Sequence, residues 1–317
     1  MREKSKPCIR FVLSVFCVVS TLGAMACSDV STKKPQPSPG GEKPQETVLT
    51  ITDGDDGDLY SYLSGLEGKV VVNVSGSADI TQDVLKSSLG SSDVEEITVD
   101  GGEAGAKIYV KSIGEKAIKA RGNALLAFKN VEFIDQTSMK TGWAVWSTEF
   151  GGKLYFENCT FKSGVLLKDD ADAVFKNCDF SGSIADMYAF WLLDGSATIE
   201  NCKIFGTRGI KVHEDGTDVI KMIVKNCNFG PLSVKPGFAF GSLNRQTLVD
   251  VQGCTFTDCQ PWNGNGTTGS WEGINGFYES DGQTTDEFTF TYANNTVDGV
   301  ACSDLKKEYN EAFIVVD

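Results

Sequence analysis

One pattern of hydrophobic and polar positions recurs seven times between residues 124 and 297. In each repeat, hydrophobic residues alternate with polar ones up to a fixed position, and another hydrophobic residue follows three positions later. The fixed position holds Asn130, Asn158, Asn177, Asn201, Asn226, Gly253 and Asn294. Alternation with a period of two predicts a strand with one buried face. A repeat of about two dozen residues predicts a stack of units, none of which buries a core alone.

The alternation changes phase at the fixed position, which predicts a tight corner between two strands. Asn tolerates left-handed backbone angles, and its side-chain amide can bond to the same amide one unit away. Gly253 meets the same demand. We expect the corner residue and the residue after it both to point inward, because this keeps the third following residue in the core. A further short strand, such as AIKAR or IKVH, precedes each unit.

Three strands per repeat and a column of corner asparagines resemble the right-handed parallel β-helix of the pectate-lyase-like superfamily. The resemblance covers residues from about 97 to about 300. It implies an all-β fold, a single-stranded right-handed parallel β-helix of about seven or more rungs. We assign the β-helix with its C-terminal cap to residues 113–317.

Residues 47–112 are less regular and predict an α/β cap at the N-terminal end of the stack. Leu59, Leu63 and Leu66 fit one face of a short helix, and Ile80, Val84, Leu85 and Leu89 fit a second helix. Strands are expected at Val70–Val72, Ile97–Val99 and Ile108–Val110. A stacked sheet must hide its open edge, so we expect the second helix to cover it.

The N-terminus predicts export. Residues 1–26 combine a basic start with an apolar run that is too short for a spanning helix, which is typical of a secretory signal peptide. The segment ending at Cys27 resembles the lipobox of bacterial lipoproteins, except that Ala24 stands where Leu is usual. Cys27 is then the lipidated first residue of the processed chain. Ordinary cleavage near Ala26, which leaves a free Cys27, is the alternative. Residues 27–46 are Pro-rich and predict a tether.

The charge of the chain narrows the class of partner. The formal net charge is −14, and cleavage before Cys27 removes four basic residues and one acidic residue, which leaves −17. So acidic a protein is a poor partner for nucleic acid or for anionic lipid. On the predicted strands, Lys and Glu alternate from repeat to repeat just before the corner, at Lys129, Glu157, Lys176, Glu200 and Lys225. Opposite charges on neighbouring rungs favour the correct register.

Five cysteines follow the corner position in successive repeats: Cys159, Cys178, Cys202, Cys227 and Cys254. A metal or redox array is one interpretation, but a line of thiols without a CxxC pair does not make a tetrahedral site. Disulfides along the column are a second interpretation, which the parallel side chains disfavour. We expect reduced, buried thiols that pack as small hydrophobic residues. Cys259 and Cys302 lie outside the column and could pair with each other or with Cys254.

The outer face of the strand that precedes each repeat carries the candidate ligand-binding residues. Trp146 and Trp191 fall there if the strand phase is as expected, and a long loop adds Trp262 and Trp271. Exposed aromatic rings beside basic side chains suit acidic sugars. In the pectate-lyase-like superfamily this sheet and its loops form the saccharide cleft. The aromatic side chains could instead pack beneath loops.

Catalysis is a further possibility on the same face. Lys168, Lys211 and His213 are candidates for a base or charge stabiliser. Carboxylates in the adjacent turns, Asp169, Asp170 and Asp194, are candidate calcium ligands, although their spacing matches no established calcium loop. The resemblance implies polysaccharide lyase as the enzymatic alternative, with calcium as its cofactor and acidic polysaccharide as its substrate. We favour a non-catalytic surface at the cell envelope or outer membrane that binds a glycan, a host protein or an envelope protein, with no cofactor.

Overall fold

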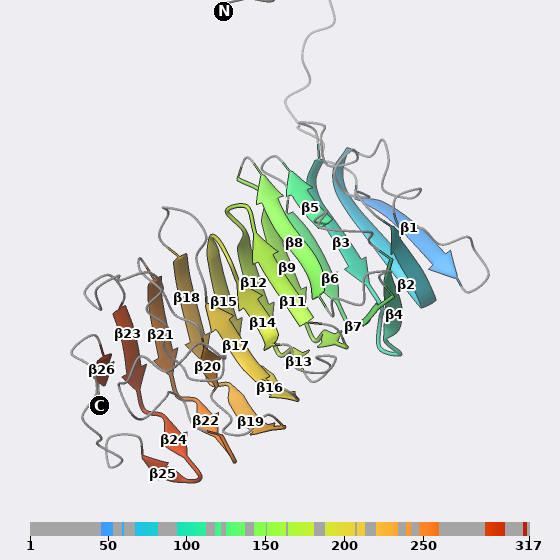
Figure 1. Cartoon of the computed structure of the whole chain (residues 1–317). Helices are drawn as coiled ribbons and strands as arrows, with labels where there is room; N and C mark the ends of the chain where they lie inside the picture. Colours follow the sequence, from blue (N-terminus) through green and yellow to red (C-terminus); the bar gives the residue numbers. More distant parts are fainter. Residues whose placement is uncertain are drawn as a thin grey trace, which may run out of the picture. The chain divides into compact units, whose positions relative to one another are not determined.

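The structure is a computed structural model. It describes residues 46–52, 59, 67–81, 94–111, 118–121, 125–136, 143–149, 151–162, 164–180, 188–206, 208–212, 220–233, 239–241, 247–259, 289–301 and 313–315. Three parallel sheets make up these residues, with the strands of each sheet side by side in chain order (Figure 1). Among the described residues, no helix has the length and apolar character needed to cross a membrane.

We number the sheets by their place relative to the corner. Sheet 1 ends at the corner and contains β1(Thr47–Thr52), the first part of β2(Gly68–Thr81), β3(Val94–Asp100), β6(Leu125–Lys129), β9(Lys153–Glu157), β12(Asp172–Lys176), β15(Ser196–Glu200), β18(Ile220–Lys225), β21(Thr247–Gln252), β23(Thr289–Ala293) and β26(Phe313–Val315).

Sheet 2 follows the corner. It contains the second part of β2, β4(Ala106–Lys111), β7(Val131–Asp135), β10(Thr160–Phe161), β13(Asp179–Phe180), β16(Lys203–Gly206), β19(Asn228–Leu232), β22(Thr255–Phe256) and β24(Thr296–Val297), with β25(Val300–Ala301) antiparallel to β24.

Sheet 3 precedes sheet 1 in each turn. It contains β5(Ile118–Arg121), β8(Trp143–Glu149), β11(Gly164–Lys168), β14(Tyr188–Leu192), β17(Arg208–Val212) and β20(Phe240–Gly241). The chain therefore passes from sheet 3 to sheet 1 to sheet 2 and repeats, which confirms the predicted parallel β-helix.

The corner between sheets 1 and 2 has the predicted backbone conformation. All six corner asparagines have φ between 52° and 55°, and Gly253 has φ of 64°. The side-chain amide of Asn158 donates to Oδ1 of Asn130 over 3.1 Å, and that of Asn177 donates to Oδ1 of Asn158 over 3.3 Å. The amide ladder expected from the sequence is thus present in these turns.

One detail of the corner differs from the prediction. Asn158 and the other corner asparagines from Asn177 onward are exposed, so the corner side chain points outward and only the next residue, such as Cys159, is buried. The left-handed corner residue places two consecutive residues, Glu157 and Asn158, on the outside. This arrangement also keeps Phe161 in the core.

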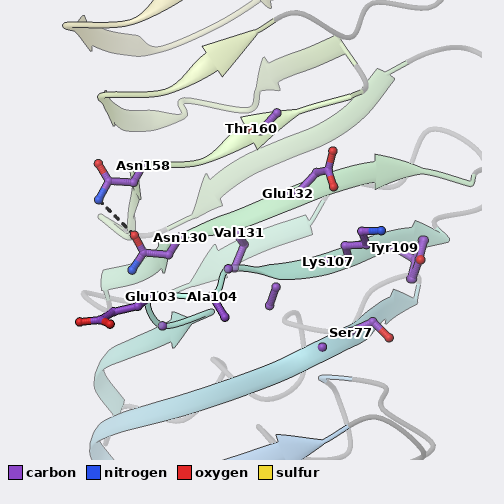
Figure 2. Close-up of a pocket in the computed structure, with 14 residues that line it drawn as sticks. Ser77, Glu103, Ala104, Lys107, Tyr109, Asn130, Val131, Glu132, Asn158 and Thr160 are labelled. Carbon is purple, nitrogen blue, oxygen red and sulfur yellow. Dashed lines mark hydrogen bonds between the residues drawn. The ribbon is translucent and has the colours of Figure 1, made fainter.

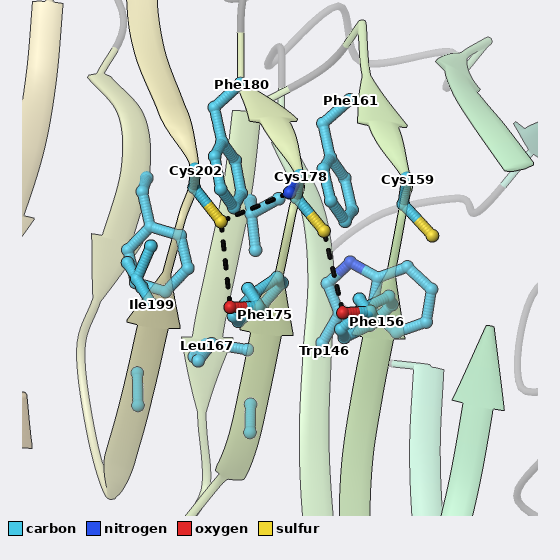
Figure 3. Close-up of a cluster of buried hydrophobic side chains, with 14 of the residues drawn as sticks. Trp146, Phe156, Cys159, Phe161, Leu167, Phe175, Cys178, Phe180, Ile199 and Cys202 are labelled. Carbon is cyan, nitrogen blue, oxygen red and sulfur yellow. Dashed lines mark hydrogen bonds between the residues drawn. The ribbon is translucent and has the colours of Figure 1, made fainter. Parts of the chain in front are cut away.

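The core is built from columns of like residues that stack from turn to turn. The rings of Phe156 and Phe175 lie 4.7 Å apart with an interplanar angle of 6°, and those of Phe161 and Phe180 lie 5.0 Å apart at 5°. Figure 3 shows both stacks beside the cysteine column. Stacked aromatic pairs contribute about 0.5–1.5 kcal/mol beyond the area that they bury.

The charges before the corner are in the expected register. Lys129, Glu157, Lys176, Glu200 and Lys225 pair in turn along sheet 1. Nζ of Lys129 lies 3.8 Å from Oε2 of Glu157.

The cysteine column consists of buried thiols, as expected. Cys159, Cys178, Cys202, Cys227 and Cys254 are all free of disulfides, and Cys259 is likewise a buried thiol. The pairings that the sequence left open for Cys254 and Cys259 are therefore not present, while Cys302 lies outside the described residues. Burial raises the pKa of the Cys178 thiol, and the hydrogen bond with Cys202 raises the pKa of Cys227 to about 12.

The described strands between residues 47 and 111 belong to the same sheets. Leu59, which the sequence places in a first short helix, is helical and fully buried, while Leu63 and Leu66 lie outside the described residues. The predicted strands at Val70–Val72, Ile97–Val99 and Ile108–Val110 are confirmed within β2, β3 and β4. The expected start of the second helix was wrong, because Ile80 and Thr81 belong to β2, where they pair with Val110 and Lys111. Residues 82–93, where the rest of that helix was expected, lie outside the described residues.

Candidate functional site

The outer face of sheet 3 carries a tryptophan–lysine pair. Trp191 of β14 and Lys211 of β17 are partners in the parallel register and both are half-buried. Nζ of Lys211 lies 3.8 Å from the centroid of the Trp191 ring. On the other side of Trp191, the register partner is Leu166 of β11, which is also half-buried. The indole is therefore flanked by a cation on one strand and by an aliphatic side chain on the other.

A second cation–aromatic pair lies at the start of the same two strands. Cζ of Arg208 lies 5.5 Å from the centroid of the Tyr188 ring. Burial raises the pKa of Tyr188 to about 12, against the opposing effect of the nearby Arg208, so the phenol is neutral at physiological pH. Within the described structure, neither Oη of Tyr188 nor Nε of Arg208 has a hydrogen-bond partner. Tyr188 is buried and is in phase with the core residue Phe190, so this pair does not add to the outer surface that carries Trp191 and Lys211.

Trp146 does not belong to this surface, and its predicted role in ligand binding was wrong. Its side chain is fully buried. In the register, Trp146 pairs with Leu167 and Ile118, both of which are core residues. The indole packs against Phe156 at a centroid distance of 5.0 Å. Trp146 is therefore part of the hydrophobic core.

The other predicted residues that the structure describes lie around one end of sheet 3. Lys168 ends β11 and is half-buried, while Asp169 and Asp170 follow it in an exposed turn with φ of 56° and 54°. The carbonyl oxygen of Asp170 accepts a hydrogen bond of 2.9 Å from Oγ1 of Thr148. Asp194 follows β14 and is half-buried. The left-handed backbone gives Asp169 and Asp170 a structural role in the turn.

No metal-binding cluster of three or more His, Cys, Asp or Glu side chains occurs in the part of the chain that the structure describes. The calcium-binding prediction for Asp169, Asp170 and Asp194 therefore gains no support from their geometry. His213, Trp262, Trp271 and Cys27 lie outside the described residues, and their predicted roles stay predictions.

A groove on the outer face of sheet 2 was not predicted from the sequence. It has a volume of about 670 Å³ and runs along β4, β7 and β10 beside the turn between β3 and β4. Figure 2 shows Glu103 and Ala104 on the turn, with Lys107, Tyr109 and Glu132 along the strands. The sequence signal for this groove is GGEAG at residues 101–105, which replaces the single corner residue of the later repeats.

Parallel sheets wound turn upon turn with an asparagine ladder at one corner define the parallel β-helix class. The chain belongs to the right-handed β-helix family, whose sequence model, described as the right handed beta helix region, matches residues 97–306. This agrees with the resemblance to the pectate-lyase-like superfamily. Comparison with the curated proteins and with the solved structures gave no significant match.

Proposed function

We propose that this protein binds acidic glycans through the outer face of sheet 3 and does not cleave them. The observation that carries the proposal is the contact between Lys211 and Trp191, in which the ammonium lies 3.8 Å from the centroid of the indole ring. The contact holds a cation beside an aromatic and aliphatic surface. A carboxylate or sulfate on a sugar pairs with the cation, while the sugar ring packs on the apolar surface of Trp191 and Leu166.

The charges on sheet 3 support an acidic ligand. Lys168 of β11 and Lys211 of β17 lie on the two strands that flank β14, although the formal net charge of the chain is −14. Basic side chains concentrated on one face of an acidic protein attract anions to that face, while the acidic remainder of the protein repels them. Asp169, Asp170 and Asp194 lie in the turns that follow β11 and β14.

The N-terminal sequence supports a position at the cell envelope. A signal peptide at residues 1–26, a lipidated Cys27 and a tether at residues 27–46 would attach the β-helix to the outer membrane or cell surface while leaving its faces accessible. Metabolic labelling with an alkyne-bearing palmitate tests the anchor. Label incorporated by the wild type and lost in Cys27→Ser supports it, and equal labelling of both contradicts it.

Polysaccharide lyase is the alternative activity, and one assay separates it from binding. The purified chain is mixed with neutral and acidic polysaccharides in the presence of calcium, and both retention and ultraviolet absorbance are followed. Retention of an acidic polysaccharide without absorbance from unsaturated uronate products is the expected result. Growth of that absorbance would establish a lyase and overturn the non-catalytic proposal.

A further inference from the structure

We propose that the groove on sheet 2 is a second binding site, which takes a neutral, hydroxyl-rich saccharide. The groove lies on a different sheet from the Trp191–Lys211 pair and presents different chemistry. The inference therefore goes beyond the proposed function and does not depend on it.

The groove exists because the corner between β3 and β4 is longer than the corner between β6 and β7. Asp100 pairs with Lys129 at the end of sheet 1, and Ala106 pairs with Val131 at the start of sheet 2. A single residue, Asn130, connects β6 to β7, whereas Gly101–Gly105 connect β3 to β4. The extra residues form a wall beside the outer face of sheet 2. Insertions on a regular scaffold are common places for binding sites.

Hydrogen bonds hold this wall in a defined conformation. Oδ1 of Asp100 accepts from the backbone N–H of Gly102 over 2.8 Å and from the side-chain amide of Asn130 over 2.9 Å. The backbone N–H of Ala106 donates to the carbonyl oxygen of Asn130 over 3.1 Å. A Cβ on Gly101 would lie 2.2 Å from that same oxygen, so only glycine fits there. Because the wall is already ordered before a ligand binds, binding loses less conformational entropy.

The groove presents polar groups with unused hydrogen-bonding capacity. Each amide in the ladder of Asn130 and Asn158 has two donors and two acceptor positions, and the ladder uses only part of them. Lys107 and Glu132 are register partners on β4 and β7. The ion pairs found between described residues are Lys69–Glu96, Lys111–Asp79, Lys129–Glu157 and Lys153–Asp172. Lys107 and Glu132 are not among them and are available to a ligand.

The composition of the groove favours a neutral saccharide over a peptide or a polyanion. Lys107 balances one of the two carboxylates, Glu103 and Glu132, so the groove does not favour an anion. Its apolar lining is limited to Val131, Ala104 and Ala106 together with glycines, whereas peptide-binding grooves need larger apolar pockets. Half-buried Tyr109 supplies one ring for a sugar face. A volume of about 670 Å³ suits an oligosaccharide of a few units.

Isothermal titration calorimetry on the purified full chain tests the proposal with cellotetraose, mannotetraose, chitotetraose and, for comparison, tetragalacturonate. We expect at least one of the neutral tetrasaccharides to bind. Tyr109→Ala and Lys107→Ala should each weaken that binding about tenfold, which is about 1.4 kcal/mol. Absence of binding by all three neutral probes at millimolar concentration would overturn the proposal.

Matched variants separate a binding role from a structural one. Lys203 occupies the same position after its corner as Lys107, and both are exposed, so Lys203→Ala should leave binding unchanged. Replacing Gly101–Gly105 with a single Asn restores the corner found in later turns and removes the wall. This variant should fold, as judged by an unchanged circular dichroism spectrum, and should lose neutral saccharide binding. Undiminished binding by the folded variant would contradict the assignment.

The two proposed sites can be tested separately. Trp191→Ala should weaken binding of tetragalacturonate and leave the neutral ligand unaffected, and Tyr109→Ala should do the reverse. Loss of both ligands in either folded variant would show that a single site binds both, which would overturn the second site.

Discussion

At the scale of single residues, the side chain that follows the corner forms hydrogen bonds with two backbone groups. Sγ of Cys227 accepts from the backbone N–H of Cys202 over 3.4 Å and lies 3.6 Å from the carbonyl oxygen of Ile199, to which it donates. Asn295 does the same after the corner at Asn294, where Oδ1 accepts from the backbone N–H of Cys254 over 2.7 Å and Nδ2 donates to the carbonyl oxygen of Val251 over 2.9 Å. The thiol and the amide are therefore two ways to form hydrogen bonds with the buried backbone N–H and C=O groups near the corner.

The first prediction removes one thiol from this column. Cys227→Ala should lower the free energy of unfolding by about 1–3 kcal/mol, because the buried N–H of Cys202 then has no acceptor. Cys227→Ser retains a donor and acceptor and should cost less than Cys227→Ala. Guanidinium denaturation of both variants checks this. Equal costs would mean that the thiol contributes packing alone.

The second prediction concerns alkaline pH. The side-chain hydrogen bond with the preceding cysteine raises the pKa of Cys202, Cys227 and Cys254, and burial raises that of Cys178. Because the folded state holds these protons more tightly, the stabilisation is fully present below the pKa of an unfolded thiol, about 8.5, and is lost as the pH rises toward 12. Each thiol should lower the free energy of unfolding by about 1.4 kcal/mol per pH unit in this window.

Urea titrations at intervals between pH 7.5 and pH 10 measure that slope, and the tyrosines, whose usual pKa is about 10, contribute only at the upper end of this range. Cys227→Ser should reduce the slope by the contribution of one thiol. A flat profile up to pH 10 would contradict burial of the thiols in solution.

At the scale of the elements, the sequence predicts the columns of the β-helix but not the side on which the corner asparagine lies. Two arrangements keep Phe161 buried: Asn158 and Cys159 both inward, or Glu157 and Asn158 both outward. The hydrophobic pattern does not distinguish them, because both bury Cys159 and they differ only in the side of the polar Asn158. The amide ladder selects the outward arrangement, since Asn158 can then bond to Asn130 without burying its remaining polar atoms.

The third prediction tests the corner. Asn177 has φ of 54°, and its amide donates to Asn158 over 3.3 Å. Asn177→Ala should cost about 1–2 kcal/mol more than Asn177→Gly, because both lose the amide but only alanine pays the steric cost of the left-handed conformation. Thermal unfolding of the two variants under one buffer condition makes the comparison. A glycine variant as unstable as the alanine variant would show that the ladder, rather than the backbone angle, dominates.

Sheet 3 and the groove show where prediction from sequence alone stops. The WAVWS segment has apolar residues in both phases, so only its register with Leu167 places Trp146 inside. Trp191 of β14 pairs instead with the half-buried Leu166 and lies outside. The groove depends on an inserted turn beside side chains from three strands that are far apart in the sequence. A repeat pattern identifies the columns, but an irregular turn becomes a site only when its neighbours are placed in space.

At the scale of the whole molecule, the β-helix carries two proposed ligand surfaces, one for a charged ligand and one for a neutral ligand. Sheet 3 presents Lys211 against Trp191 for an acidic glycan. The groove on sheet 2 presents amides, a tyrosine and balanced charges for a neutral one. The β-helix supports both surfaces, because side chains on the outer face of each sheet have fixed positions and do not contribute to the core. The fold alone does not decide between binding and catalysis.

The fourth prediction addresses the central claim, that the Trp191–Lys211 pair binds acidic glycan without cleaving it. The most direct measurement is the affinity of the full chain for tetragalacturonate in the wild type, Trp191→Ala, Lys211→Ala and the control Tyr155→Ala, whose residue is half-buried on the outer face of sheet 1. We predict that the two sheet 3 variants each lose about tenfold in affinity, a cost of about 1.4 kcal/mol. The control should match the wild type, and the recovered ligand should be intact. Equal affinity in all four proteins, or cleaved ligand, would contradict the account.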